Sequence, residues 1–265
     1  MRPRYLAPFL LIWICLCPSM AQQSTTRAPS RDPQALAILE QVVRNGGGLQ
    51  SIADLRGFSG SGSITFYWTE EGTEGTVNLK GRGYQQLRID AHLSDGNDQW
   101  WFVKDGRGFK REIDGTTRPL MHQEVANVET FYFPLSHVAK ALRDSSVGVS
   151  FLGTVTKDGR PALGVRLSAA PPRPSPRSSD GEQGRRDFYI DSRSFHVLAV
   201  EDYAYPKERN TDGLQRRIEF SDYRNTGGLL MPFSITELLA GHPLVKVQLD
   251  ELSVSALSDS ADFEP

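Results

Sequence analysis

Apolar and polar residues alternate along most of the chain from Ser59 to Val254, and a period of two predicts antiparallel β-strands with one buried face. The clearest example is the stretch 214–241, LQRRIEFSDYRNTGGLLMPFSITELLAG. Its two alternating arms are separated by the run 225–228, NTGG, whose residues tolerate a positive φ. We expect this stretch to form one β-hairpin. The other strands are expected to pair mostly with their neighbours in sequence.

Two segments have helical spacing instead. In the first, Asp32 is a predicted N-cap and Pro33 the first helical residue, followed by an apolar stripe that stops at the glycines 46–48. In the second, residues 117–144, apolar side chains fall at helical intervals on two pieces that Pro134 divides. Both pieces must bury an apolar face, and the apolar face of the sheet is the expected partner.

These patterns predict a mainly β (α+β) protein with a single antiparallel sheet of roughly ten or eleven strands and a helical lid. In the last strand the apolar positions change from odd to even numbers at Asp250 and Glu251, which predicts a β-bulge there. No linker divides the chain after the first helix begins, so we expect one domain over residues 32–265.

Three segments are expected to lie outside this packed domain. A short basic start, an apolar run and small residues at its end predict a signal peptide over residues 1–21, cleaved after Ala21. Residues 22–31 are polar and predict a flexible leader. Residues 169–186 are rich in proline, arginine and glycine with almost no apolar side chains, so they predict a disordered loop insertion.

Cysteine content and charge narrow the class of protein. Both cysteines, Cys15 and Cys17, lie in the predicted signal peptide, so the exported chain would have no disulfide and no thiolate metal site. The formal net charge is −2, and lysine and arginine do not cluster outside the predicted loop. We therefore expect no nucleic acid as a partner.

Few residues are candidates for catalysis or metal binding. No two of the five histidines have the i, i+2 or i, i+4 spacing that lets two side chains share a metal. The glycine runs at 46–48 and 59–63 match neither a nucleotide loop nor a nucleophile elbow. Adjacent carboxylates on one strand point to opposite faces, so they form no catalytic pair by themselves. We expect no metal, no cofactor and no enzymatic activity.

Apolar side chains are abundant on one face of the strands and on the helical lid. A curved sheet covered by helices can leave an apolar cavity between the two layers, although the helices could also complete a packed core. From the alternation alone, ten residues are expected to line such a cavity: Phe66, Trp68, Leu87, Ile89, Trp101, Met121, Val125, Phe131, Phe220 and Phe233.

The order of these elements and several short motifs resemble a known family. The motifs are FYID at 188–191, FSDYR at 220–224, GLLMPF at 228–233 and DFEP at 262–265. They resemble the LolA/LolB-like periplasmic outer-membrane lipoprotein-sorting proteins, and the order of elements extends this resemblance over most of the chain. The resemblance implies an unclosed β-barrel in which helices form a lid over an interior that holds acyl chains.

We therefore expect a monomeric periplasmic carrier or binding protein for the acyl chains of lipoproteins or lipids. Its expected partners are donor and acceptor proteins at the inner or outer membrane. The alternative is a non-carrier envelope sensor or scaffold module that uses the same fold to dock another protein and has a packed interior. An envelope hydrolase would need a set of catalytic residues that the sequence does not show.

Overall fold

The structure is a computed structural model of the chain. It describes residues 29–83, 86–112, 114–120, 124–125, 128, 131–157, 159–168, 184–204, 213–254 and 263. The predicted signal peptide, most of the predicted leader and Met121 lie outside these residues, as does residue range 169–183 of the predicted loop.

The named elements are three helices and thirteen strands. The helices are Pro33–Asn45 (α1), Leu49–Ala53 (α2) and Pro134–Arg143 (α4). The strands are Gly57–Phe66 (β1), Thr73–Arg82 (β2), Gln86–Leu93 (β3), Gln99–Lys104 (β4), Arg107–Arg111 (β5), Thr117–Pro119 (β6), Gly148–Lys157 (β7), Arg160–Ser168 (β8), Arg185–Asp191 (β9), Val197–Ala204 (β10), Leu214–Thr226 (β11), Leu229–Leu239 (β12) and His242–Val254 (β13).

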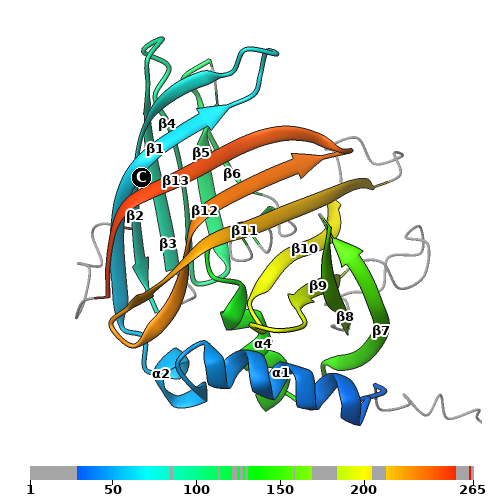
Figure 1. Cartoon of the computed structure of the whole chain (residues 1–265). Helices are drawn as coiled ribbons and strands as arrows, with labels where there is room; N and C mark the ends of the chain where they lie inside the picture. Colours follow the sequence, from blue (N-terminus) through cyan, green and yellow to red (C-terminus); the bar gives the residue numbers. More distant parts are fainter. Residues whose placement is uncertain are drawn as a thin grey trace, which may run out of the picture.

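All thirteen strands form one antiparallel sheet that curves strongly without closing (Figure 1). Its order is β6-β5-β4-β3-β2-β1-β13-β12-β11-β10-β9-β8-β7, so every strand pairs with a sequence neighbour except where β1 meets β13. Strands β6 and β7 are the two free edges. The chain between them, residues 120–147, contains the helical segment. The predicted unclosed β-barrel is confirmed, whereas the predicted ten or eleven strands are too few.

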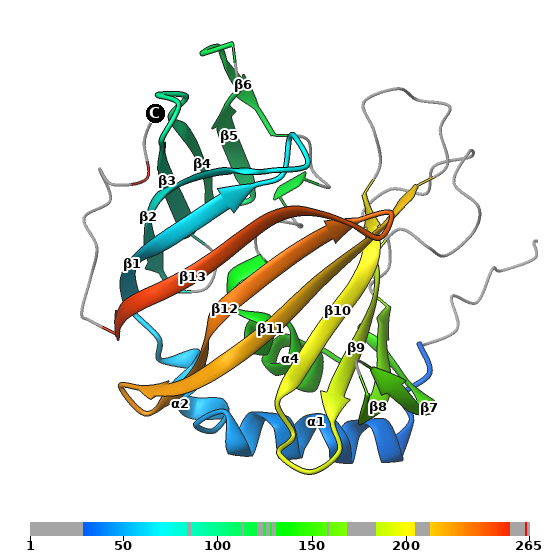
Figure 2. The same cartoon turned by 45° about the horizontal axis from the view of Figure 1, so that its top comes forward.

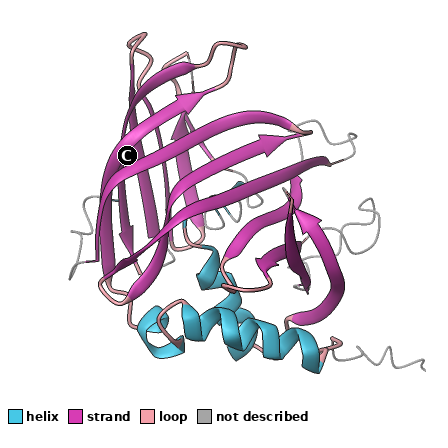
Figure 3. Cartoon of the chain, viewed as in Figure 1, coloured by secondary structure: helices cyan, strands magenta, loops and turns pink. Residues whose placement is uncertain are grey.

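The helices gather at one end of the sheet, and α4 lies in its hollow (Figure 2, Figure 3). Helix α1 packs on α4 and β7, and its buried face includes Leu39 and Val42. The cap of α1 is the predicted one, because the carboxylate of Asp32 accepts hydrogen bonds from the backbone N–H groups of Gln34 (2.7 Å) and Ala35 (3.2 Å). The apolar stripes of the helices therefore complete the core of the sheet.

The hairpin and the bulge follow the sequence pattern. Strands β11 and β12 pair in antiparallel register, and Gly227 and Gly228 turn the chain with φ of 58° and 85°. Such a pair of positive φ values suits a tight hairpin turn, where glycine avoids the steric penalty of a Cβ atom. On β13, Glu251 pairs with Ser61 and Leu249 with Gly62, which leaves Asp250 as the bulged residue. Both predictions are confirmed.

Three boundaries differ from the sequence prediction. Strand β6 occupies residues 117–119, the start of the predicted helical segment, because it can extend the sheet by pairing with β5. Arg185 and Arg186, assigned to the disordered loop, begin β9 and pair with β8. Arg31, assigned to the flexible leader, donates hydrogen bonds to three carbonyl oxygens of residues 141–147 and bridges to Val149.

Replacement of Asp32 with alanine should destabilise the protein by about 0.5–2 kcal/mol, because two N–H groups at the start of α1 lose their acceptor. The Asp32→Asn variant keeps a side-chain oxygen at the cap and serves as the control, with a smaller loss expected. Urea denaturation followed by circular dichroism measures both changes. Equal losses in the two variants would contradict a capping role.

Candidate functional site

An open cavity of about 370 Å³ lies between the inner face of the sheet and the helical segment that follows β6. Both layers and the β4–β6 edge of the sheet contribute side chains to it. The lining residues are Phe66, Trp68, Gln99, Trp101, Lys110, Arg111, Glu112, Leu120, Glu124, Val128, Phe131, Ala204, Arg216, Glu237, Leu239, Leu244 and Val245. We call this space the inner cavity.

One wall of the inner cavity is aromatic. The ring of Phe66 stacks on Trp68 with centroids 4.9 Å apart and meets Trp101 edge-on at 6.1 Å. Trp68 and Trp101 are only half-buried, and Phe131 lines the cavity from the helical segment. Half-buried aromatic rings facing a cavity provide apolar surface that a ligand can remove from water.

Another part of the lining, on β11 and β12, carries charge. Arg216, only 3 % exposed, forms two parallel hydrogen bonds to Asp202 at 2.7 and 2.6 Å and contacts Glu237 at 3.4 Å. Arg186 lies 3.7 Å from the same Asp202 carboxylate. A bidentate arginine–carboxylate pair between neighbouring strands compensates for part of the desolvation of both groups. Of these groups, Arg216 and Glu237 line the cavity.

Burial shifts the pKa of Glu237 in the lining and of His137, which does not line the cavity but is affected by the charge of Arg216. It raises the pKa of Glu237, and Arg216 only partly offsets the effect. It also lowers the pKa of His137 on α4 well below the ordinary value, a shift to which the positive charges of Arg186, Lys140 and Arg216 add. His137 is therefore a neutral imidazole near neutral pH, and the neutral form of Glu237 is favoured relative to an exposed glutamate.

Lys110, Glu112 and Glu124 line the cavity, are partly exposed and belong to a cluster of ion pairs that we call its mouth. Arg118 of β6 forms a hydrogen-bonded ion pair with Glu112 and two hydrogen bonds to Glu124, at 2.8 and 2.6 Å. Lys110 lies 3.3 Å from Glu112. Because Glu124 belongs to the helical segment and Arg118 to the sheet edge, these contacts fasten the segment over the cavity.

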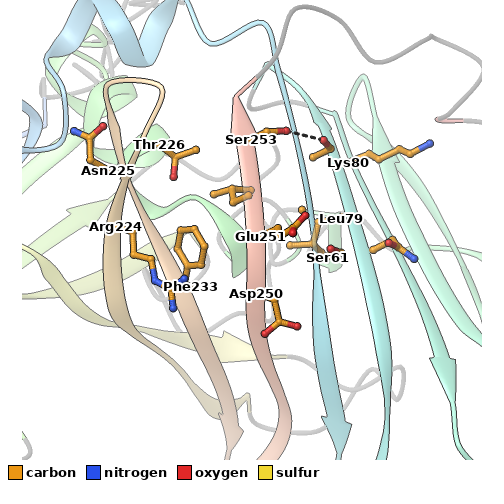
Figure 4. Close-up of a pocket in the computed structure, with 14 residues that line it drawn as sticks. Ser61, Leu79, Lys80, Arg224, Asn225, Thr226, Phe233, Asp250, Glu251 and Ser253 are labelled. Carbon is orange, nitrogen blue, oxygen red and sulfur yellow. Dashed lines mark hydrogen bonds between the residues drawn. The ribbon is translucent and has the colours of Figure 1, made fainter.

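A second cleft of about 670 Å³ lies between β13 and the β11–β12 hairpin (Figure 4). Pairing of β12 with β13 stops at Ser234 and Gln248, next to Pro232, which has no N–H to donate to the ladder. Phe233 lies in this opening with the guanidinium of Arg224 4.2 Å from its ring centroid. The cleft is otherwise lined mostly by polar side chains from β1, β2, β11 and β13.

The structure separates the ten residues expected in one cavity. Phe66, Trp68, Trp101 and Phe131 line the inner cavity. Leu87, Ile89, Val125 and Phe220 are buried but do not line it. Phe233 lines the second cleft, because β12 and β13 part at that level. Met121 lies outside the described residues.

Sequence reasoning missed the polar lining. Gln99 and Glu237 each lie two residues from an inward-facing apolar side chain, Trp101 and Ile235, so the period of two placed them on the inner face. Arg216 is likewise two residues from the buried Ile218. The alternation therefore indicated the inner face for all three residues, whereas only apolar side chains were expected to line the cavity.

Within the described part of the chain, no three His, Cys, Asp or Glu side chains are placed to hold a metal ion. No helix among those residues has both the length and the apolar character needed to cross a bilayer.

Comparison with known proteins identifies the fold. No protein-family model matches the sequence, and no curated protein matches it significantly. Solved structures do match. One is a DUF1329 family protein from Desulfovibrio piger, with a TM-score of 0.55, 10% identity, and coverage of 87% of this chain and 97% of that one.

Two further structures agree. A domain assigned to outer membrane lipoprotein sorting, from Vibrio parahaemolyticus, has a TM-score of 0.53 at 9% identity, covering 87% of this chain and 96% of that chain. A LolA superfamily protein from Nitrosomonas europaea has a TM-score of 0.52 at 11% identity, covering 87% and 97%. The architecture is an open antiparallel barrel with a helical cover. The fold is LolA-like, as the sequence motifs indicated.

The raised pKa of Glu237 predicts a pH-dependent effect of the Glu237→Gln substitution. The folded state holds the proton of Glu237 to higher pH than the unfolded chain, whose glutamate pKa is about 4.3. Stability from this group is therefore complete below about pH 4.3 and is lost as pH rises through the folded-state pKa. Glutamine does not titrate, so the stability of the variant relative to the natural protein should rise over that window. Denaturation midpoints across a pH series measure it, and a difference independent of pH would contradict it.

Proposed function

We propose that this protein binds the acyl chain of a lipid or a lipoprotein in the inner cavity and carries it through the periplasm. The observation that supports this most is the aromatic wall of Phe66, Trp68 and Trp101, which faces an open space under the helical segment. A volume of about 370 Å³ lies at the lower end of the range of roughly 300–1,000 Å³ for small-molecule sites. Such a site suits one acyl chain better than several.

The driving force is the removal of apolar surface from water. Each methylene group that is buried contributes about 0.8 kcal/mol, so even part of an acyl chain against these rings gives measurable affinity. The charged cluster at the mouth, with Arg118 and Glu124, would stay hydrated while the chain enters. This arrangement of an apolar interior and a polar rim favours an amphiphile over a fully apolar molecule.

The open cavity also bears on the alternative of a docking module. A docking module is expected to have a packed interior, whereas the half-buried Trp68 and Trp101 face the inner cavity. Several ionisable groups that line the cavity are engaged in ion pairs, such as Arg216 with Asp202, Glu124 with Arg118, and Lys110 with Glu112, and this favours binding over catalysis. We therefore propose a binding protein rather than an enzyme.

The comparisons support the cellular setting. One structural neighbour is assigned by its description to outer membrane lipoprotein sorting and another to the LolA superfamily. Together with the predicted signal peptide, residues 1–21, this favours export to the periplasm. There the chain would act as a monomer that exchanges its ligand with donor and acceptor proteins at the membranes.

Two adjacent tryptophans provide a matched test. Trp101 faces the inner cavity, whereas Trp100 lies on the other face of β4 and stacks on Phe102. The Trp101→Ala variant should bind an environment-sensitive fatty-acid probe about tenfold more weakly, because burying a large apolar side chain contributes about 1.5–3 kcal/mol and about 1.4 kcal/mol is a tenfold change in affinity. The Trp100→Ala variant should bind like the natural protein.

The measurement is a fluorescence titration of both purified variants, accompanied by lipid extraction and mass spectrometry of the natural protein. Thermal unfolding of each variant checks that the fold is retained. Absence of saturable probe binding and of bound lipid in the natural protein would overturn the proposed function. Equal weakening by both substitutions would show that the probe does not occupy the inner cavity.

A further inference from the structure

Two polar side chains in the inner cavity have hydrogen-bonding capacity that the described residues do not fill. Gln99, at the start of β4, is only 8 % exposed, and its side-chain amide has no hydrogen-bond partner within the described part of the chain. The carboxyl of Glu237 has one contact among those residues, the long 3.4 Å approach of Arg216, and is 16 % exposed. Both side chains line the same space as the aromatic wall.

Buried polar groups are nearly always hydrogen-bonded, since an unmade bond in a low-dielectric site leaves the cost of desolvation uncompensated. A ligand that filled the cavity with methylene groups alone would dehydrate Gln99 and Glu237 without giving them partners. A ligand with a carbonyl group would accept from the amide of Gln99. Burial raises the pKa of Glu237, and a neutral carboxyl can donate one hydrogen bond and accept others.

The charges around the cavity do not favour an anion. Of the cations that line the cavity, Lys110 already lies 3.3 Å from Glu112, and Arg111 is half-buried. The most buried cation, Arg216, already has a bidentate partner in Asp202. A carboxylate brought next to Glu237 would compete with Asp202 for the same guanidinium, whereas an uncharged carbonyl group would leave that pair intact.

We propose that Gln99 and Glu237 make the inner cavity selective for acyl chains that end in an uncharged, carbonyl-bearing linkage, an ester or an amide, over chains that end in a free carboxylate. This inference rests on the proposed function, because it assigns the chemical class of the ligand that the same cavity takes. Gln99 and Glu237 are the residues that determine specificity, while the aromatic wall supplies affinity for the chain itself.

The competing ligand is a free fatty acid whose carboxylate pairs with Arg111 at the mouth. Arg111 has no ion-pair partner among the described residues, but it is only half-buried. A cation that stays partly exposed to water gains less from an ion pair than a fully buried one, because water still solvates it. The Gln99 side chain, by contrast, is only 8 % exposed and its amide has no hydrogen-bond partner among the described residues, so a ligand that displaces its remaining water has to supply one. The geometry therefore favours Gln99 over Arg111 as the group that contacts the head of the ligand.

The experiment compares monomyristoylglycerol with myristate, which share one acyl chain, at about pH 8, where a carboxylic acid is ionised. Calorimetric titration should show monomyristoylglycerol binding about tenfold more tightly, equivalent to about 1.4 kcal/mol. The Gln99→Leu variant should lose most of that preference and leave myristate affinity little changed. Gln215→Leu, on an exposed strand position outside the cavity, is the matched control. The Glu237→Gln variant keeps a neutral hydrogen-bonding group and should retain the preference.

The outcomes separate the two proposals. If neither amphiphile binds, the proposed function fails. If both bind with equal affinity and Gln99→Leu changes neither, acyl-chain binding stands and the selectivity is overturned. If myristate binds more tightly and Arg111→Gln abolishes that binding, the ligand is a fatty acid held at the mouth, which also overturns the inference. Melting temperatures of all variants show whether any loss of binding reflects loss of fold.

Discussion

Strands β6 and β7 lie at opposite ends of the sheet and do not pair with each other, although closure would satisfy both edges. They are joined instead by residues 120–147, a connection whose α4 has an apolar face that must be buried. The connection therefore packs into the concave side, and the sheet has to stay open to receive it. The inner cavity is the space that this covering leaves beside Phe66 and Trp101, where large rings meet a short helical segment rather than a facing sheet.

Charged side chains inside this apolar hollow lose their hydration, and ion pairing compensates for part of that loss. Asp202 and Arg216 lie directly opposite each other on β10 and β11, and their bidentate hydrogen bonds compensate for part of the desolvation. Glu237 takes part only through a long contact, so its carboxyl remains available to a ligand. The same strands thus provide both a buried ion pair and a polar group with few contacts among the described residues, and the proposed discrimination between head groups rests on this combination.

The motif GLLMPF at 228–233, which supported the resemblance to LolA-like proteins, has a structural explanation. Gly228 helps to form the tight hairpin turn, and Pro232 ends the β12–β13 ladder because it has no N–H group. Phe233 then fills the opening beneath Arg224. A motif that forms a turn and ends a strand pairing indicates a fold and not a ligand. The class of ligand depends on the side chains that line the cavity.

The sequence by itself determined most of the strands, the Asp32 cap, the hairpin and the bulge at Asp250, since each depends on residues close together in the chain. It also placed Phe66, Trp68 and Trp101 on the inner face. The tertiary structure alone decided that Phe233 lines a different cleft and that Leu87 and Ile89 are covered by neighbours. It also decided that the side-chain amide of Gln99 has no hydrogen-bond partner among the residues that the structure describes. Alternation assigns a side chain to a face of the sheet, but curvature, strand separation and the course of the helical segment decide whether that face meets protein or open space.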